Sequence, residues 1–266
     1  ENESPTFLLI DGDNGLGQVV AQSAIDIAME RAKQYGTCAV AIHNTNHMGM
    51  LSYYAERASR NNMISNIMCN TPPFVAAIGG AEPILGTNPI CWGIPASEFP
   101  IIMDMAISPA RGRVKNALDK GEEIPEGWAL NKDGEPTTDA QEAMDGVLLP
   151  SGGVKGYGIG LIVELFTGIM SGANFGKHMP HPLDDYENKP DIGNYIAVFD
   201  VEKVMPIDAF KGRVAEYIKM VKSSKLMAGS SGIFMPGEIE YMKEKKNLQE
   251  GISIDPKLYE EYKSLG

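Results

Sequence analysis

The stretch TFLLIDGDNGLGQVVAQSAIDIAMERAKQYGTCAVAIH, residues 6–43, decides the fold class. Residues 6–10 form an apolar run typical of a short strand, and DGDNGLG follows as a turn. From residue 18 apolar side chains recur near helical spacing, and Gly36 is a natural helix stop. Residues 38–43 predict a second strand. A strand, a helix and a strand in this order indicate an α/β protein.

Outward from this unit, the chain continues to alternate strand and helix patterns, with no internal repeat. In the first half we expect a helix at 51–62, a strand at 64–69, ordered loop with short strands at 70–100, a buried strand at 99–106, and a helix from Ser108 with Pro109 as its first residue. A polar, turn-rich surface at 124–144 follows, and then a buried helix over 159–170 and a strand at 194–202. Towards the end we expect an amphipathic helix at 208–224, a short strand and then a charged helix within 231–246, and a surface element at 258–266.

Composition and charge exclude several classes of protein. The 266 residues suffice for one large or two small domains, and 43% hydrophobic with 22% charged residues is ordinary for a globular protein. A net charge of −12 argues against nucleic acid or anionic membrane as a partner. No apolar run reaches the ~18 residues of a membrane span, and the start of the sequence does not resemble a signal peptide. Three cysteines without C-x-x-C spacing indicate buried thiols in a reducing cytoplasm.

The usual cofactor fingerprints are absent, but one glycine-rich stretch carries a physical signal. DGDNGLG matches neither G-x-G-x-x-G nor a calcium loop. In GGVKGYG, residues 152–158, Lys155 stands at the expected start of a long helix. Free N–H groups, the positive end of the helix dipole and the ammonium would converge there on a phosphate or carboxylate. The alternative is a plain glycine turn with a lysine in solvent.

His43 and His47 lie four residues apart where a strand gives way to a loop. Without a helix, this spacing does not put both rings on one face, so a zinc site would need His178, His181, Asp184 or Asp185 to approach. A histidine just past a strand end in an α/β fold is placed to meet a ligand and titrates near neutral pH. Acid/base catalysis and a hydrogen-bonded loop residue both remain open from the residues alone.

Weaker signals lie between these motifs. LGTNP, residues 85–89, is either a tight turn or backbone held against a flat cofactor, and in MDMAIS, residues 103–108, Asp104 either caps something or ends a strand that supports a nucleotide. Arg111 and Arg113 form a surface helix face or meet an acidic ligand.

Seven motifs in order make the whole chain resemble the malate/L-lactate dehydrogenase family of NAD(P)H-dependent oxidoreductases. They are IDGDNGLGQVVA, NHMGMLSYYAERA, GGAEPILGTNP, MDMAISPARGRV, GEEIPEGWALNKDGEPTTD, LLPSGGVKGYGIGL and MPGEIE. The resemblance implies an α/β, non-Rossmann mixed-sheet fold of the sulfolactate-dehydrogenase-like type with helices packed on the sheet. It also implies a homodimer with the active site near the subunit interface.

The resemblance assigns roles to individual residues. His47 matches the family's catalytic proton acceptor. Residues matching the family's contacts to NAD or NADP are Thr71, Met105, Ala106, Ile107, Lys155, Gly156, Gly237 and Glu238, and no metal ligand is implied. Ile107 replaces the family's usual Thr, so that position has no side-chain hydroxyl.

These assignments predict hydride transfer between the nicotinamide cofactor and a small 2-hydroxy or 2-oxo acid, such as malate, lactate, sulfolactate or ureidoglycolate. We expect residues 1–65 and 236–266 to face substrate and dimer partner, and residues 66–235 to bind cofactor. The family usually begins with a helical segment, bearing a Ser-His-Gly motif and an arginine for the substrate carboxylate, that does not precede residue 1 here. The alternatives are therefore a catalytically silent nucleotide-binding scaffold and, from the histidines, a zinc hydrolase.

Overall fold

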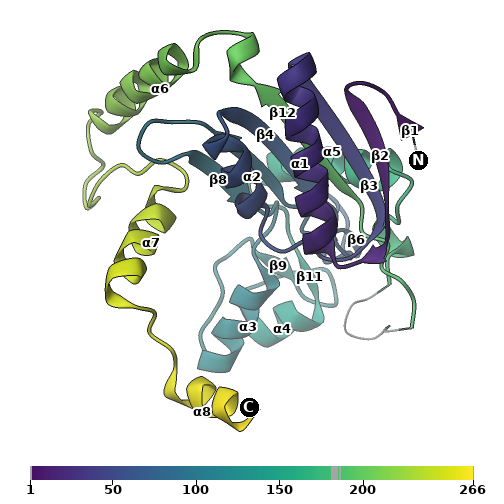
Figure 1. The fold of residues 1–266 in the computed structure, drawn as a ribbon. Helices are drawn as coiled ribbons and strands as arrows, with labels where there is room; N and C mark the ends of the chain where they lie inside the picture. Colours follow the sequence, from purple (N-terminus) through teal and green to yellow (C-terminus); the bar gives the residue numbers. More distant parts are fainter. Residues whose placement is uncertain (1, 181–184, 186, 266) are drawn as a thin grey trace.

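The computed structural model describes residues 2–180, 185 and 187–265, and it is built around two β-sheets (Figure 1). Among the described residues, the larger sheet has seven strands in the order β1-β2-β3-β12-β4-β7-β8, and the smaller has five in the order β10-β9-β11-β5-β6. The strands are β1 (Asn2–Glu3), β2 (Phe7–Gly15), β3 (Thr37–Thr45), β4 (Met63–Cys69), β5 (Val75–Ala76), β6 (Pro83–Leu85), β7 (Ile90–Ile94), β8 (Ile101–Met105), β9 (Ala129–Leu130), β10 (Pro136–Thr137), β11 (Val147–Leu148) and β12 (Asn194–Asp200).

Helices cover the larger sheet and extend away from it. They are α1 (Gly17–Tyr35), α2 (Leu51–Arg60), α3 (Arg111–Lys120), α4 (Ala140–Asp145), α5 (Val154–Glu164), a π-helical continuation η1 (Leu165–Ile169), 3-10 turns η2 (Gly176–His178) and η3 (Val201–Lys203), α6 (Ile207–Lys222), α7 (Glu238–Glu250) and α8 (Pro256–Ser264). Helices α1 and α2 pack on the larger sheet, with α1 against β3 and β12 and α2 against β4 and β7.

The expected strand–helix–strand unit forms at the start of the chain. Strands β2 and β3 are parallel, and α1 connects them. Helix α1 turns its alanine stripe, including Ala24, Ala28 and Ala32, fully into the core because these residues recur at helical spacing. It ends at Gly36, whose φ of 93° is a left-handed cap and whose N–H donates to the Ala32 carbonyl. The other neighbouring strands of this sheet are antiparallel, so the predicted mixed-sheet, non-Rossmann class is confirmed.

The register of the larger sheet gathers several strand ends at one edge. Met68 on β4 pairs with Ile90 on β7, and Ile90 pairs with Met105 on β8. Strand β12 runs the opposite way to its neighbours β3 and β4, and its first residue, Asn194, pairs with both. The last residues of β3, β4 and β8 therefore lie at the same end of the sheet, and this end is called the site edge below.

Two hydrophobic cores follow from this layout. The larger core joins α1 and α2 to the sheet and contains all three cysteines, which are buried and free as expected. The smaller core lies between the five-stranded sheet, α3 and α4 (Figure 1), with Val75, Ile107 and Ala129 almost fully buried.

Several local expectations are wrong, for tertiary reasons. The expected turn after residue 10 is a continuation of β2 to Gly15, with an irregular register and left-handed Asp13 and Asn14. Strand β8 is an edge strand rather than a buried one, so Asp104 and Met105 are exposed. Helix α3 begins at Arg111 rather than near Ser108, so Pro109 precedes it.

Three further expectations need correction. The polar stretch 124–144 forms the β9–β10 hairpin and α4, and Ala129 in it is fully buried. The apolar helix over 159–170 is only partly buried, because it leaves Ile162, Leu165 and Ile169 about half exposed on its outer side. The expected strand within 231–236 is irregular chain in this described part of the molecule.

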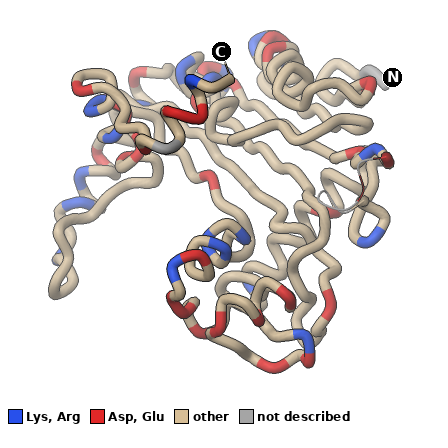
Figure 2. The backbone as a smooth tube through the Cα atoms, turned by 90° about the horizontal axis from the view of Figure 1, so that it is seen from below, with Lys and Arg blue, Asp and Glu red and all other residues tan. Residues whose placement is uncertain are grey.

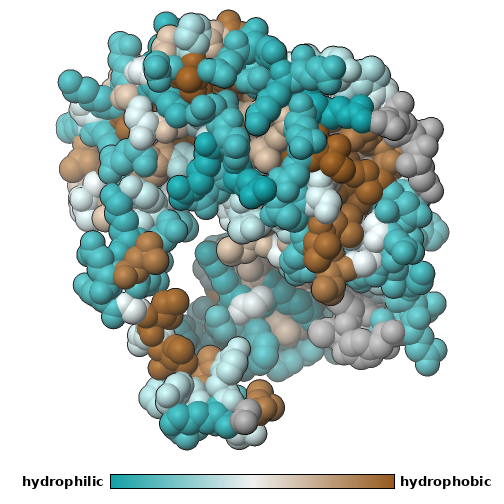
Figure 3. All heavy atoms as spheres, in the orientation of Figure 1, coloured by the Kyte–Doolittle hydropathy of each residue, from teal (hydrophilic) through white to brown (hydrophobic). Residues whose placement is uncertain are grey.

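The C-terminal helices form an arm that extends away from both sheets (Figure 1). Among the described residues from 202 onward, Glu238 is the only buried one. Apolar side chains such as Met227, Leu248 and Ile252 are more than 70% exposed, and hydrophobic atoms line the lower arm in Figure 3. An exposed apolar surface of this kind is typical of an interaction surface.

Charged side chains are distributed unevenly between the larger sheet and the helices and loops around it. Figure 2 shows lysine, arginine, aspartate and glutamate gathered on helices and loops, whereas the strands of the larger sheet are mostly uncharged. Within the described residues, no helix is long and apolar enough to cross a lipid bilayer.

Candidate active site

His47 lies two residues after β3, at the site edge, which is the end of the sheet where β3, β4 and β8 terminate. Strand β3 ends at Thr45, and the loop then crosses the edge to reach α2, which starts at Leu51 and packs on β4 and β7. The first turn of α2 is tied to β8 because the Asp104 carboxylate accepts the Ser52 N–H at 2.7 Å. Asp104 therefore caps the first turn of α2, which is one of the two roles that the sequence left open for it. The same contact ties the chain that follows His47 to β8, the strand that ends at Met105.

The His47 ring is exposed and partly oriented by its own loop. Its Nδ1 accepts the Gly49 N–H at 3.1 Å, and this contact favours the ring tautomer that carries its proton on Nε2. The backbone is fixed from behind, because a Cβ on Gly17 would lie 2.1 Å from the Asn46 carbonyl oxygen and only glycine fits. His43 lies within β3 instead, so the two rings do not form a paired clamp.

Hydrogen bonds join three of the segments that the resemblance assigns to the cofactor. Thr71 Oγ1 accepts the Thr87 N–H at 2.9 Å, and the Thr87 carbonyl accepts the Ile107 N–H at 2.9 Å. The Ile107 carbonyl in turn accepts the Ser151 N–H at 2.8 Å, and a Cβ on Gly156 would lie 3.2 Å from it. Thr71, the 105–107 segment and the start of α5 are thus one connected surface, although they are far apart in sequence.

The start of α5 is open to an anion. No side chain among the described residues caps the helix, and Gly152 and Gly153 have positive φ, with no atom within 4 Å of where a Cβ would stand on either. Lys155 is exposed in the first turn and forms no ion pair with any described residue. An unobstructed glycine backbone, a helix N-terminus and a free ammonium fit the pyrophosphate of a dinucleotide.

Gly237 and Glu238 lie against the outer edge of β8. The Ile102 N–H donates to the Pro236 carbonyl at 3.1 Å, three residues before Met105 on the same strand. Glu238 is buried and forms an ion pair with Lys222, and its other oxygen accepts the Met235 N–H at 2.9 Å. Burial alone would raise the pKa of Glu238, but the Lys222 ammonium and the Met235 N–H outweigh it and lower that pKa. Its carboxylate is therefore engaged with the protein itself.

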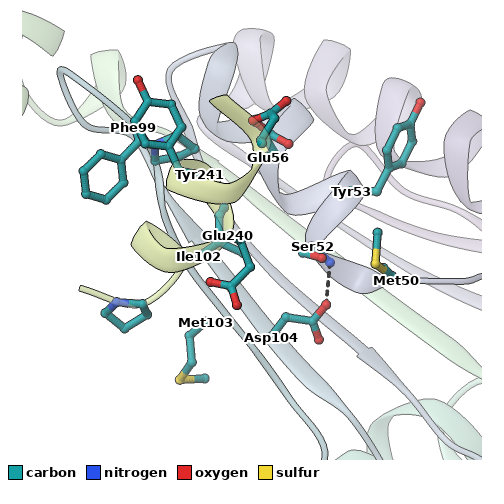
Figure 4. Close-up of a pocket in the computed structure, with 14 residues that line it drawn as sticks. Met50, Ser52, Tyr53, Glu56, Phe99, Ile102, Met103, Asp104, Glu240 and Tyr241 are labelled. Carbon is teal, nitrogen blue, oxygen red and sulfur yellow. Dashed lines mark hydrogen bonds between the residues drawn. The ribbon is translucent and has the colours of Figure 1, made fainter. Parts of the chain in front are cut away.

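A pocket of about 580 Å³ lies between α2, β8 and α7 (Figure 4). Met50 and Tyr53 reach it from α2, Met103 and Asp104 from β8, and Gly237 from the loop before α7. Met50 is only three residues after His47, so this pocket adjoins the histidine loop. Apolar side chains make up much of the lining, and the carboxylates of Glu56, Asp104 and Glu240 also face the pocket in Figure 4.

A second pocket of about 450 Å³ lies at the glycine loop before α5. Ser151, Gly152 and Gly153 line it together with Pro109 and Trp128. The segment from Met105 to Ser108 connects Asp104, which lines the first pocket, with Pro109, which lines the second.

The sequence did not reveal the support behind this surface. Asn88 and Glu164 are buried and hydrogen-bonded to each other at 2.6 Å, 76 residues apart. The only available signal was the TNP turn that contains Asn88. No group of three potential metal ligands occurs among the described residues, and the suggested ligands His181 and Asp184 lie outside them.

Several solved structures with this architecture are dehydrogenases. Sulfolactate dehydrogenase from Methanocaldococcus jannaschii matches with a TM-score of 0.89 and 40% identity, over 97% of this chain and 74% of that one. Malate dehydrogenase from Entamoeba histolytica matches with a TM-score of 0.92 and 31% identity, over 100% of this chain and 77% of that one. The fold and the site therefore place the chain in the class of α/β dehydrogenases that these two structures represent.

Sequence comparison identifies the family within that class. The malate/(S)-sulfolactate dehydrogenase of Methanothermus fervidus is 40% identical over 266 residues, which is 100% of this chain and 77% of the relative. The family model for malate/L-lactate dehydrogenase matches residues 1–263. The chain therefore belongs to the malate/L-lactate dehydrogenase family, as the ordered motifs predicted.

Proposed function

We propose that the protein is an NAD(P)-dependent dehydrogenase that interconverts a small 2-hydroxy acid and its 2-oxo acid, with His47 as the catalytic acid/base. The observation that carries the proposal is the clustering of predicted site segments at the site edge of the larger sheet. There the His47 loop, Thr71, Met105–Ile107 and the start of α5 are linked by strand register and hydrogen bonds.

In this proposal the chain binds the cofactor along that edge. Lys155 and the α5 N-terminus hold the phosphates, while Met105, Ala106 and Thr71 support the remainder. Ile107 is buried behind them and holds the segment in place through its bonds to Thr87 and Ser151. Gly156 allows α5 to approach the Ile107 backbone, and Gly237 with Glu238 secures the outer edge of β8. The nicotinamide supplies the hydride chemistry when it is bound. Within that frame, the His47 ring takes a proton from the substrate hydroxyl or returns it to the carbonyl oxygen, and Nε2 accepts that proton once the Gly49 N–H has left Nδ1 and the ring proton sits on Nδ1.

The decisive experiment replaces His47 with alanine. We expect turnover with malate or sulfolactate to fall by at least about 10²-fold while NADH affinity stays nearly intact, because the ring acts on substrate rather than cofactor. His178→Ala is the control, since His178 is an exposed histidine whose ring packs on Phe175 and to which the family resemblance assigns no role. Unchanged turnover in His47→Ala would remove His47 from catalysis. Cofactor binding by the wild-type chain without any oxidation would favour the silent scaffold.

Substrate and cofactor choice are open within the family. A relative from Escherichia coli K12, 30% identical over 262 residues, is named ureidoglycolate dehydrogenase (NAD(+)). We propose to screen malate, lactate, sulfolactate and ureidoglycolate with both NAD and NADP. A substrate that is turned over with one nicotinamide at least tenfold better than with the other fixes both choices.

We further propose a homodimer in the cytoplasm, with residues 1–65 and 236–266 facing substrate and partner and residues 66–235 binding cofactor. The exposed apolar side chains of the C-terminal arm support an association, and the free buried cysteines fit a reducing compartment. Light scattering on the purified chain tests the dimer. A mass of 28.8 kDa at all concentrations would contradict it.

A further inference from the structure

A buried carboxylate lies behind the proposed cofactor surface. Glu164, the last residue of α5, is 7% exposed, and each of its oxygens accepts one N–H. Oε2 accepts from Asn88 Nδ2 at 2.6 Å, and Oε1 accepts from the Gly176 N–H at 2.8 Å. Burial, reinforced by the nearby Glu164 carboxylate, raises the pKa of Cys69 to about 12, which places this charge beside the end of β4.

Glu164 and the Gly160 carbonyl together fix which way the Asn88 amide faces. Asn88 is fully buried and left-handed, with φ of 35°. Its amide nitrogen lies between two acceptors, Glu164 Oε2 and the Gly160 carbonyl at 3.0 Å. Because both neighbours are acceptors, this end must be NH₂, and the Asn88 oxygen then turns to the Thr71 N–H at 3.3 Å.

From Thr71 the contacts continue into the proposed cofactor surface. Thr71 Oγ1 accepts the Thr87 N–H, and Thr87 in turn accepts the Ile107 N–H. The packing leaves little slack, since a Cβ on Gly86 would lie 2.2 Å from the Thr71 carbonyl oxygen. A reversed Asn88 amide would therefore displace Thr71 rather than be absorbed locally. The turn after Glu164 is π-helical, a feature frequent at functional sites.

We propose that Glu164 is a positioning residue for the nicotinamide cofactor, acting through Asn88 to fix Thr71 and the backbone on which the cofactor lies. The proposal rests on the proposed function. Glu164 acts through another residue because its hydrogen bonds run to Asn88 and Gly176, neither of which the family resemblance assigns to the cofactor.

The test is Glu164→Gln, which keeps the shape and converts one acceptor into a donor. Two N–H donors then face one oxygen and one NH₂. If the new amide keeps its oxygen on the Gly176 N–H, its NH₂ meets the Asn88 NH₂, and the Asn88 side chain has to shift away or turn its oxygen against the Gly160 carbonyl. Either movement takes the Asn88 oxygen from the Thr71 N–H and weakens that hydrogen bond. We expect the NADH dissociation constant to rise about tenfold, kcat at saturating cofactor to change less than about twofold, and hydrogen exchange at the Thr71 amide to accelerate.

Two matched variants separate positioning from general structure. Glu82→Gln removes an exposed ion pair to Lys177, next to Gly176, so it loosens the same loop without touching Asn88. It should leave NADH affinity unchanged. The double variant Asn88→Asp with Glu164→Gln keeps an oxygen towards the Thr71 N–H and lets the new amide at position 164 donate to residue 88, while the second carboxyl oxygen, when protonated, donates to the Gly160 carbonyl. It should recover NADH affinity to within about threefold of wild type.

A folded Glu164→Gln protein with unchanged NADH affinity and unchanged Thr71 exchange would overturn the proposal. If Glu164→Gln does not fold, the double variant decides, since recovery of folding and affinity supports the relay and failure to recover overturns it. Absence of NADH binding by the wild-type chain would contradict the proposed function instead. The Thr71 exchange rate, measured without cofactor, would still test the relay.

Discussion

Two helices of this protein begin in the same way and end up in opposite roles. A glycine with positive φ precedes each, Gly153 before α5 and Gly237 before α7, and a charged residue follows in the first turn. At α5 the glycine is open and Lys155 is free in solvent. At α7 the glycine packs on Ile102, and Glu238 is buried against Lys222 and the Met235 N–H.

The difference shows that the charge at a helix start stays available to a ligand only where the protein itself has not paired it. At α5 no described side chain caps the helix and the Lys155 ammonium has no ion-pair partner among the described residues, so an incoming anion meets an unpaired charge there. At α7 the carboxylate already uses the dipole and a lysine, so the start of the helix is a clamp on β8. The same family resemblance assigns both to the cofactor, and the structure gives them different physical tasks.

The largest expected effect is on stability, at α7. Glu238→Ala leaves the Met235 N–H without its acceptor and Lys222 without its partner. We expect the free energy of unfolding to fall by about 2 kcal/mol, moderated because Lys222 can still reach water. Denaturant unfolding measures this, and NADH titration is the companion readout. A stable Glu238→Ala protein with much weaker NADH binding would indicate that Glu238 is a cofactor ligand. That result would contradict the proposed difference between the starts of α5 and α7.

The next effect is on binding, at α5. Lys155→Ala should weaken NADH binding about tenfold, or about 1.4 kcal/mol, and should slow chemistry less, because the ammonium meets the phosphates and not the reacting carbon. Its melting temperature should stay close to that of wild type. Lys155→Arg is the control that keeps the charge. NADH affinity that is the same in wild type and Lys155→Ala would show that the free ammonium has no ligand role.

A smaller effect is expected from the glycine that packs on β8. Gly237→Ala forces a side chain into the left-handed region and places Cβ 3.1 Å from the Ile102 nitrogen. We expect a loss of about 1 kcal/mol or slightly more. Gly229→Ala is the matched control, with a φ of 80° and no atom within 4 Å. If both variants lose the same stability, the Ile102 contact contributes nothing and only backbone strain remains.

The smallest effect is a pH dependence confined to the α7 clamp. Because the pKa of Glu238 is lowered in the folded protein, its contribution to stability is present above the usual glutamate value of 4.5 and disappears as the pH falls through the folded pKa. The stability difference between wild type and Glu238→Gln should therefore shrink as the pH drops below 4.5. A difference that is constant between pH 7 and pH 3.5 would show that the charge of Glu238 is immaterial.

Local pattern alone predicted much of this molecule. The β2–α1–β3 unit, helix α2, β4 and β12 follow from apolar spacing and glycine stops, because burial on one face repeats with the period of the element. The open start of α5 was also predictable, since glycines and Lys155 are neighbours in sequence. The ordered motifs pointed to the family, which the comparisons confirm.

Only the tertiary structure decided which elements lie at the edges and which charges are paired. An apolar run such as 99–106 reads the same in a central or an edge strand, because hydropathy does not encode strand order. Glu238 meets Lys222, and Glu164 meets Asn88, across 16 and 76 residues of chain. Whether a charge is free to bind or already satisfied depends on partners that folding brings from far away, and no local pattern records them.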